Sequence, residues 1–107
     1  MGIAVRSYFV DTLKRRPSGT AMTITINESA LKHRISREDI LKAMALPLVD
    51  RLMPEYLNKY LLLGFAGNGQ LLEIMYNIRD DGSCNVFHAM KCRKAFYHLA
   101  EESGYYV

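Results

Sequence analysis

Four apolar stretches of the chain have the composition and length of β-strands. They lie at 22–27, 59–65, 71–78 and 84–90. The first alternates apolar and polar residues, which is the period of a half-buried strand. The dipeptides Asn68-Gly69 and Asp81-Gly82 separate the other three, and such pairs favour tight hairpin turns. The pattern therefore predicts one early strand and, in the second half, an antiparallel meander.

Helix signals fall between and after these strands. Asn27 can cap a short helix, ESALKH, and Ser36 with Asp39 makes a capping-box-like start for a longer one, REDILKAMA. Pro47 ends the second helix, and KCRKAFYHLAEE predicts a third at the end of the chain, while PLVDRLMPEYLN receives no assignment. The predicted order is β-α-α-β-β-β-α. This order indicates an α+β fold, with an antiparallel sheet of about four strands and helices on one face.

The turns also predict which residues oppose one another, if each Asx-Gly pair is the centre of a two-residue turn. The predicted pairs include Met75–His88, Tyr76–Phe87, Leu61–Tyr76 and Gly64–Glu73. One face of the meander is then wholly apolar and forms the predicted core: Leu61, Leu63, Phe65, Leu72, Ile74, Tyr76, Phe87 and Ala89. The open face carries Glu73 and His88 as diagonal neighbours, with Gly64 leaving room above the carboxylate.

Length and charge indicate the class of protein. The chain has 107 residues, the size of one domain, and a net charge of +3. We place the domain at 22–107 and treat 1–21, which contain the polar break KRRPSG, as an N-terminal extension before a candidate true start at Met22. Positive charge is concentrated at the two ends of the chain. A solvated surface and a phosphate-facing patch both account for that distribution.

The sequence has no signal for a membrane span, a metal or a disulfide framework. Cys84 and Cys92 are too few for such a framework and lack the spacing of a zinc site, so we expect reduced thiols. No run reaches the roughly 18 apolar residues of a membrane span, and Arg6 interrupts the apolar N-terminal segment. We therefore expect a cytoplasmic protein without metal, cofactor or membrane association.

Glu73 and His88 are the candidate chemistry of the open face. A carboxylate and an imidazole within reach of each other can accept and donate a proton, and several cations follow His88 in HAMKCRK. An ion pair on a solvated sheet face accounts for the same arrangement without any reaction. The residues alone leave both interpretations open.

Four segments, LKHRISREDI, KYLLLGF, NGQLLEIMY and VFHAMKCRKAFY, together resemble the BrnT-like toxins of bacterial toxin–antitoxin modules, within the wider RelE-type ribonuclease superfamily. The most specific part is KHRIS followed by RED, which is similar to the family's Lys-His-Gly-(Val/Ile)-Ser-x-Glu-(Glu/Asp). The resemblance covers about residues 22–100. It implies a RelE-like fold, and a toxin neutralised by a cognate DNA-binding antitoxin from a neighbouring gene.

The resemblance also implies a reaction, the metal-independent cleavage of RNA by attack of the 2′-hydroxyl. Such cleavage needs a base, an acid and cations around the phosphate. We expect the catalytic residues to be Glu73, His88, Lys91 and Arg93. We expect Arg79, Lys94, Tyr97 and Lys59 to bind RNA. The implied partners are the antitoxin and RNA, with or without the ribosome, and homo-oligomerisation stays open.

Two differences from the family pattern bear on this expectation. Arg34 stands where the family has glycine, at a position where a left-handed helix cap favours glycine. Met90 stands where the family has arginine, so that its work would fall to Lys91 or Arg93. His33 matches a family histidine, but we expect it to cap or pack the end of the first helix. The alternative function is a non-catalytic module that binds RNA or a protein; a small-molecule sensor domain lacks any supporting motif.

Overall fold

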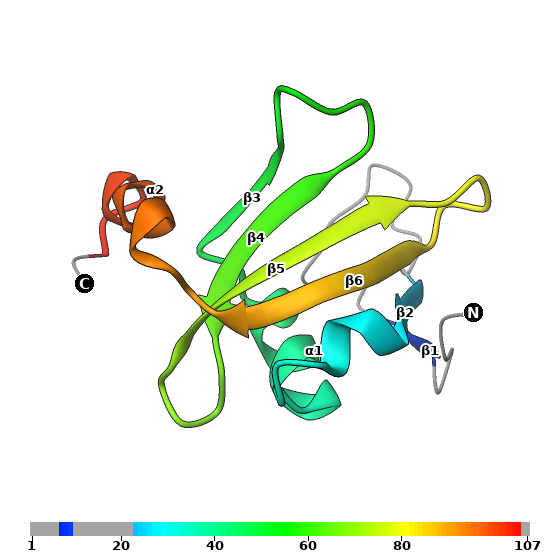
Figure 1. Ribbon diagram of the computed structural model, residues 1–107, viewed down its shortest axis with the longest axis horizontal. Helices are drawn as coiled ribbons and strands as arrows, with labels where there is room; N and C mark the ends of the chain where they lie inside the picture. The colour runs from blue at the N-terminus through cyan, green and yellow to red at the C-terminus, as the bar shows by residue number, and fades with distance from the viewer. Residues whose placement is uncertain (1–6, 10–22, 106–107) are drawn as a thin grey trace.

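A computed structural model describes residues 7–9 and 23–105 of the chain. The strands are β1 (Ser7–Phe9), β2 (Thr23–Ile26), β3 (Val49–Leu52), β4 (Tyr60–Phe65), β5 (Leu71–Ile78) and β6 (Cys84–Lys91). The helices are two 3₁₀-helices, η1 (Glu28–Leu31) and η2 (Lys94–Phe96), and two α-helices, α1 (Arg37–Ala45) and α2 (Tyr97–Glu102). The fold is α+β, as predicted (Figure 1).

The strands form one six-stranded sheet in the order β1-β2-β6-β5-β4-β3. β2 runs parallel to β6, because η1 and α1 carry the chain across the sheet after β2, and the other neighbouring pairs are antiparallel. The predicted antiparallel meander of β4, β5 and β6 is confirmed. The prediction of an antiparallel sheet of about four strands is wrong, because the sheet has six strands and one of its pairs is parallel.

Two of the strands lie where the sequence pattern gave none. β3 comes from the unassigned segment, and three of its four side chains are exposed, so that it shows no apolar period. β1 lies within the predicted extension 1–21 and pairs with β2. The remainder of that segment and the candidate start at Met22 are outside the described residues.

The two predicted helix caps are present. The Asn27 side chain accepts a hydrogen bond from the Ser29 backbone N–H at 3.0 Å, and that of Ser36 accepts one from the Asp39 N–H at 3.1 Å. The first helix is shorter and tighter than predicted, because it is the 3₁₀-helix η1 and ends at Leu31. Both caps satisfy backbone donors that the first turn of a helix leaves without partners.

The two hairpin turns of the meander are one residue longer than predicted. In the β5–β6 turn the Arg79 N–H donates to the Ser83 carbonyl at 2.8 Å, and Gly82 has a φ of 87°. The β4–β5 turn has the same form, with Gly69 at φ 87°. Glycine adopts this left-handed conformation readily, which a three-residue turn requires at its last position.

The longer turn shifts the β4–β5 register by one residue. Gly64 opposes Leu72 rather than Glu73, so the predicted pairs Gly64–Glu73 and Leu61–Tyr76 are both wrong. A shift by one residue exchanges the two faces of a strand. Consequently Leu62 lies on the same face as Ile74, whereas Leu61 and Leu63, which we predicted there, lie on the opposite face.

A β-bulge in β6 corrects the register where the candidate site lies. Tyr76 opposes Val86, as the longer turn requires, but Met75 opposes His88. Phe87 is the extra residue between these pairs. The predicted pair Met75–His88 is therefore confirmed, whereas Tyr76–Phe87 is wrong.

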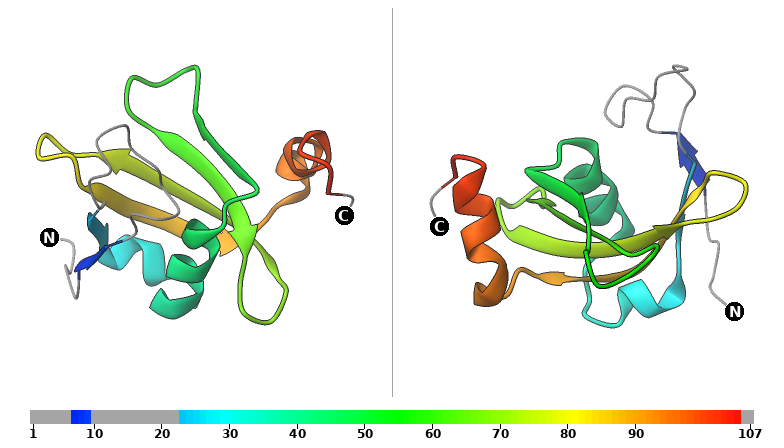
Figure 2. Two further views of the ribbon diagram at one scale, coloured as in Figure 1. Left: turned by 180° about the vertical axis from the view of Figure 1, so that it is seen from behind. Right: turned by 90° about the horizontal axis from the view of Figure 1, so that it is seen from above.

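Apolar side chains cover both faces of the sheet, and the prediction that all helices lie on one face is wrong. On the first, the α1 face, a core cluster packs against η1 and α1 and includes Ile24, Ile26, Ile40, Ala43, Met44, Leu62, Leu72, Ile74, Tyr76 and Val86. On the second, the α2 face, a smaller cluster packs with η2 and α2: Leu61, Leu63, Leu71, Met75, Cys92 and Ala100. Figure 2 shows α2 at the end of the sheet away from β1 and β2.

Gly64 allows α1 to lie directly on the sheet. A Cβ atom at this position would be 2.4 Å from the carbonyl oxygen of Ala43 in α1. The sequence analysis predicted that Gly64 leaves room above Glu73. That prediction is wrong, because the glycine instead allows α1 to pack on the sheet.

The last helix begins later than predicted. β6 continues to Lys91, and the Cys92 N–H still donates to the Leu71 carbonyl at 2.9 Å. Arg93 is also extended, and the first helical turn starts at Lys94. Residues 91–93 therefore continue in an extended conformation instead of opening a helix, which brings Arg93 beside Glu73 of β5.

Candidate active site

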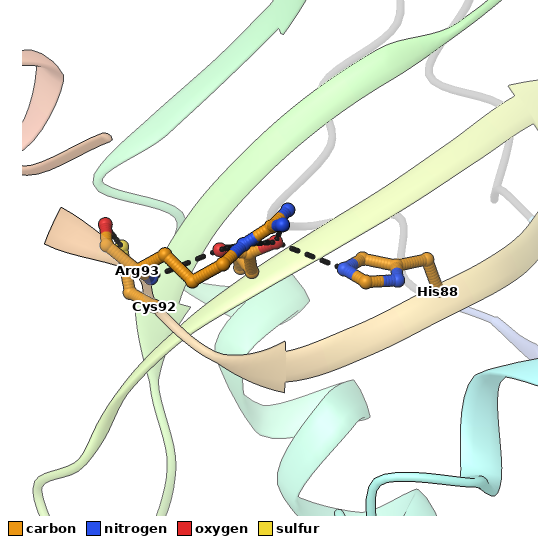
Figure 3. A network of polar contacts seen from close by, with 4 residues as sticks. His88, Cys92 and Arg93 are labelled. Carbon is orange, nitrogen blue, oxygen red and sulfur yellow. Dashed lines mark hydrogen bonds and ion pairs between the residues drawn. The ribbon is translucent and has the colours of Figure 1, made fainter. Parts of the chain in front are cut away.

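Glu73 is the centre of the candidate site. Its side chain points to the α2 face of β5 and is fully buried, at 0% exposure. Its Oε2 lies 2.9 Å from Nε2 of His88 and 2.6 Å from Nη2 of Arg93. Its Oε1 accepts hydrogen bonds from Nε of Arg93 at 3.0 Å and from the Arg93 backbone N–H at 2.9 Å. Because a buried carboxylate is costly without such partners, the three residues form one unit, the Glu73–His88–Arg93 cluster (Figure 3).

The hydrogen bonds keep Glu73 ionised. Burial raises the pKa of this carboxyl group, but hydrogen bonds from the side chain and backbone of Arg93 and from His88 outweigh burial, so that its pKa falls below the ordinary value of 4.5. The same interaction with Glu73 raises the pKa of Arg93. At neutral pH the cluster therefore contains a carboxylate that only accepts hydrogen bonds.

The carboxylate selects the tautomer of the His88 ring. Since Glu73 only accepts, Nε2 of His88 carries the proton of their 2.9 Å contact, and in the neutral ring Nδ1 has a free lone pair for another proton. The side chain is 19% exposed, so the ring is accessible to a substrate at the surface. This is the arrangement in which a carboxylate orients a histidine that transfers protons.

The bulge in β6 and the element η1 place His88. The carbonyl of Phe87, the bulged residue, accepts a hydrogen bond from Oγ of Ser29 in η1 at 2.8 Å. The Asn27 N–H donates to the Val86 carbonyl at 2.8 Å, immediately before the bulge. Bulges often redirect a side chain beside a functional site, and η1 and its cap residue Asn27 hold this one at Phe87 and at the residue before it.

Arg93 joins the cluster to the surface. Its Nε and Nη2 face Glu73, while its side chain is 53% exposed. A guanidinium group has five N–H donors, so these contacts leave Nη1 for an anion from solution. The guanidinium carbon also lies 5.6 Å from the centre of the Phe96 ring, which limits its orientation.

The other predicted residues near the end of β6 do not join the cluster. Lys91 opposes Leu72, a residue of the α1 face, so it lies on the other side of the sheet from Glu73. Lys94 is exposed in η2, and Tyr97 packs against the apolar cluster of the α2 face. These residues flank the candidate site rather than complete it.

Arg79 and Lys59 lie at the far end of the sheet. Arg79 is six residues beyond Glu73, which is roughly 20 Å along an extended strand. Its Nη2 donates to Oδ1 of Asn85 at 3.1 Å. Nζ of Lys59 lies 4.2 Å from the centre of the Tyr56 ring. Neither residue contacts the cluster, so their expected contribution is to binding at a distance.

His33, which the sequence analysis assigned to capping or packing the end of the first helix, lies just after η1 and contacts His88. Its ring lies edge-on to the ring of His88, with centroids 5.7 Å apart and an interplanar angle of 74°. The next residue, Arg34, has a φ of 67°, which confirms the left-handed conformation that the sequence predicted there. The sequence signal for this residue is the match of His33 to a family histidine in KHRIS.

Within the described part of the chain, no group of three or more His, Cys, Asp or Glu could hold a metal ion, and no helix is long and apolar enough to cross a membrane. Cys84 and Cys92 are both buried free thiols. Burial raises the pKa of Cys92 to about 11, so this thiol next to the cluster is not a nucleophile at neutral pH.

The structure defines an α+β domain whose sheet carries a buried carboxylate between a histidine and an arginine. Comparisons with known protein families, with curated proteins and with solved structures find no match for this chain. We therefore infer its function from the chemistry of the cluster.

Proposed function

We propose that the protein is a metal-independent endoribonuclease, in which a ribose 2′-hydroxyl attacks the adjacent phosphate. The observation that carries this proposal is the 2.9 Å contact between the buried Glu73 and His88, with Arg93 half exposed beside it. A proton-transfer group next to a cation is what this reaction needs. The resemblance to BrnT-like and RelE-type toxins supports the same activity and a RelE-like fold.

His88 is the base in this proposal, and Glu73 is the group that orients it. Nδ1 of His88 takes the proton of the 2′-hydroxyl, and the carboxylate stabilises the imidazolium ion that results. Glu73 cannot reach substrate because it is fully buried and both of its oxygens already accept hydrogen bonds. For Glu73 the geometry therefore favours orientation of His88 over abstraction of a proton from the substrate.

Arg93 holds the phosphate and compensates the charge that grows on its oxygens. Its Nη1 faces away from the carboxylate contacts, and hydrogen bonds from arginine to phosphate are among the stronger ones in proteins. Arg79 and Lys59, at the far end of the sheet, would bind the RNA backbone beyond the cleaved bond, with Lys94 and Tyr97 near η2.

A second candidate function is a non-catalytic module that binds RNA. The observation that favours it is Met90, which stands opposite Glu73 where the family pattern has an arginine. Under this alternative Arg93 and Glu73 are a structural ion pair, and the surface cations bind RNA without cleaving it.

Labelled, unstructured RNA incubated with the purified protein in EDTA tests the two functions. The parent protein is expected to release products with 2′,3′-cyclic phosphate ends, and His88→Ala to lose this activity by roughly 10²–10⁴-fold. Lys91→Ala is the matched control, because Lys91 is exposed on the opposite face of the sheet and should leave cleavage unchanged. Salt-sensitive binding without cleavage, with or without ribosomes, would favour the binding module instead.

The proposal includes a cognate antitoxin, as the resemblance implies, and action in the cytoplasm, as we expect from the cysteines and the apolar pattern of the sequence. Expression of the protein alone should arrest growth of a bacterial host, whereas His88→Ala should not. Co-expression of a DNA-binding protein from the neighbouring gene should restore growth and yield a stable complex. Arrest that persists with His88→Ala would contradict the link between toxicity and cleavage.

A further inference from the structure

The proposed cleavage needs two proton-transfer groups, and the Glu73–His88–Arg93 cluster supplies one. A base removes the proton of the 2′-hydroxyl, and an acid gives a proton to the departing 5′-oxygen. Glu73 is buried and fully hydrogen-bonded, and Arg93 does not lose its proton in the accessible pH range. His88 can act once in each turnover, so a second group must come from outside the cluster.

We propose that His33 is the general acid that protonates the 5′-oxygen, as the partner of His88. The centroids of the two rings are 5.7 Å apart, and both oxygens that exchange protons belong to one phosphodiester. Two groups that act on one phosphate must each come within hydrogen-bond reach of it, roughly 2.6–3.2 Å, so they must be close neighbours. His33 is exposed, which lets it exchange protons with solvent between turnovers.

The loop around His33 is fixed rather than loose. η1 is anchored to β6 by the hydrogen bond from Ser29 to the Phe87 carbonyl. After His33 the Arg34 N–H donates to the Leu31 carbonyl at 3.1 Å, and Arg34 adopts the left-handed φ of 67°. The segment 29–34 is therefore held at Ser29 and at Arg34, and these contacts position the His33 ring beside His88.

The step balances in atoms and protons. Neutral His88 takes the proton of the 2′-hydroxyl as the bond from that oxygen to phosphorus forms. The bond from phosphorus to the 5′-oxygen breaks, and protonated His33 gives its proton to that oxygen. The products are a 2′,3′-cyclic phosphate and a 5′-hydroxyl end, and exchange with water restores both histidines.

This inference depends on the proposed ribonuclease function, and a change of leaving group separates the two. The first substrate is a dinucleotide such as uridylyl-adenosine, whose 5′-oxygen needs a proton to depart. The second is uridine 3′-(4-nitrophenyl phosphate), whose leaving group departs without one. The enzymes are the full-length parent, His33→Ala, His33→Gln, His88→Ala and His98→Ala. The last is a matched control that replaces the exposed histidine of α2.

The His33 variants should lose roughly 10²–10⁴-fold on the dinucleotide but stay within a few-fold of the parent on the nitrophenyl substrate. His98→Ala should match the parent on both substrates. Thermal melting of the variants should match the parent, since His33 is exposed. A merely structural role for His33 would lower both rates together.

An equal loss on the two substrates overturns the assignment of His33 as the acid, and no loss on either overturns any catalytic role for it. If instead the His88→Ala variant is the one rescued by the nitrophenyl leaving group, the two roles are reversed and the proposal fails. A parent protein that cleaves neither substrate overturns the proposed function itself, and this inference falls with it.

Discussion

On the α1 face of β5, Leu72, Ile74 and Tyr76 pack among apolar side chains, whereas on the α2 face Glu73 lies between Leu71 and Met75. The first face gains stability from close packing, with a hydrogen bond from the Tyr76 hydroxyl to Oδ1 of Asp50 at 2.6 Å. The second includes a buried charge whose desolvation is offset by hydrogen bonds to Arg93 and His88. One strand therefore separates a face that stabilises the fold from one that holds reactive groups.

Two backbone positions show the same contrast. Gly64 faces α1 and provides the space that a helix needs to approach a strand. Arg34, in the loop that carries His33, has a left-handed backbone that glycine would adopt at lower cost. Local geometry on the α1 face favours stability, whereas near the site Arg34 has a backbone conformation that is unfavourable for its residue type.

Gly64→Ala should have the largest effect on stability. Its Cβ atom would lie 2.4 Å from the Ala43 carbonyl oxygen, and that oxygen is backbone, so α1 must move as a whole. We expect the free energy of unfolding to fall by about 3 kcal/mol or more, measured by urea denaturation.

Gly67→Ala is the control, because a Cβ atom there has its nearest neighbour, Asp39 Oδ1, at 3.4 Å. This variant should be unchanged or more stable by about 0.4–1 kcal/mol. Equal effects of the two substitutions would contradict the close approach of α1 at Gly64.

Glu73→Gln should have the next largest effect, and it should separate stability from activity. The amide removes the charge that accepts hydrogen bonds from Arg93 and His88, so we expect a loss of about 1.5–3 kcal/mol in urea denaturation. The variant should also lose most of the proposed cleavage, since an amide does not stabilise the imidazolium ion. A variant that keeps full cleavage would show that Glu73 has a structural role alone.

The proximity of Glu73 and His88 could be predicted from the sequence, although the two-residue turn from which we derived it is wrong. An Asx-Gly dipeptide fits a three-residue turn with glycine in the left-handed position as well as a two-residue turn, so the pattern could not fix the turn length. The pair Met75–His88 still follows, because the extra turn residue and the bulge at Phe87 shift the register in opposite directions. No bulge compensates in β4, and there the predicted register is wrong.

Other parts of the structure depend on contacts between segments that are distant in the sequence. The strand β3 was missed because its side chains are mostly exposed, and only pairing with β4 makes it a strand. The end of β6 was assigned to a helix because KCRKAF has a helical pattern, whereas the buried Glu73 carboxylate binds the Arg93 N–H and keeps the segment extended. The contact of His33 with His88 likewise depends on η1 packing against β6.

Acid should weaken the α2 face selectively. The pKa of Glu73 is lower in the folded protein than its ordinary value of 4.5, so its contribution to stability is complete above that pH and is lost as pH falls through the folded value. The parent should therefore become less stable below about pH 4.5, as measured by the thermal midpoint. Stability of the Glu73→Gln variant should decline less steeply in acid than that of the parent. An identical decline would assign the acid sensitivity to other groups. Asp81 is one such group, because hydrogen bonds from Ser83 also lower its pKa.

Arg34→Gly should have the smallest effect, and it should be a gain in stability. Relief of the left-handed conformation is worth roughly 1–2 kcal/mol. The greater freedom of glycine in the unfolded chain offsets roughly 0.5–1 kcal/mol of this gain. A net increase of about 0.5–1 kcal/mol is therefore expected in urea denaturation, whereas Arg34→Ala should show no gain because alanine keeps the same strain. A gain with both variants would point to the arginine side chain rather than the backbone, and the contrast between Gly64 and Arg34 would then fail.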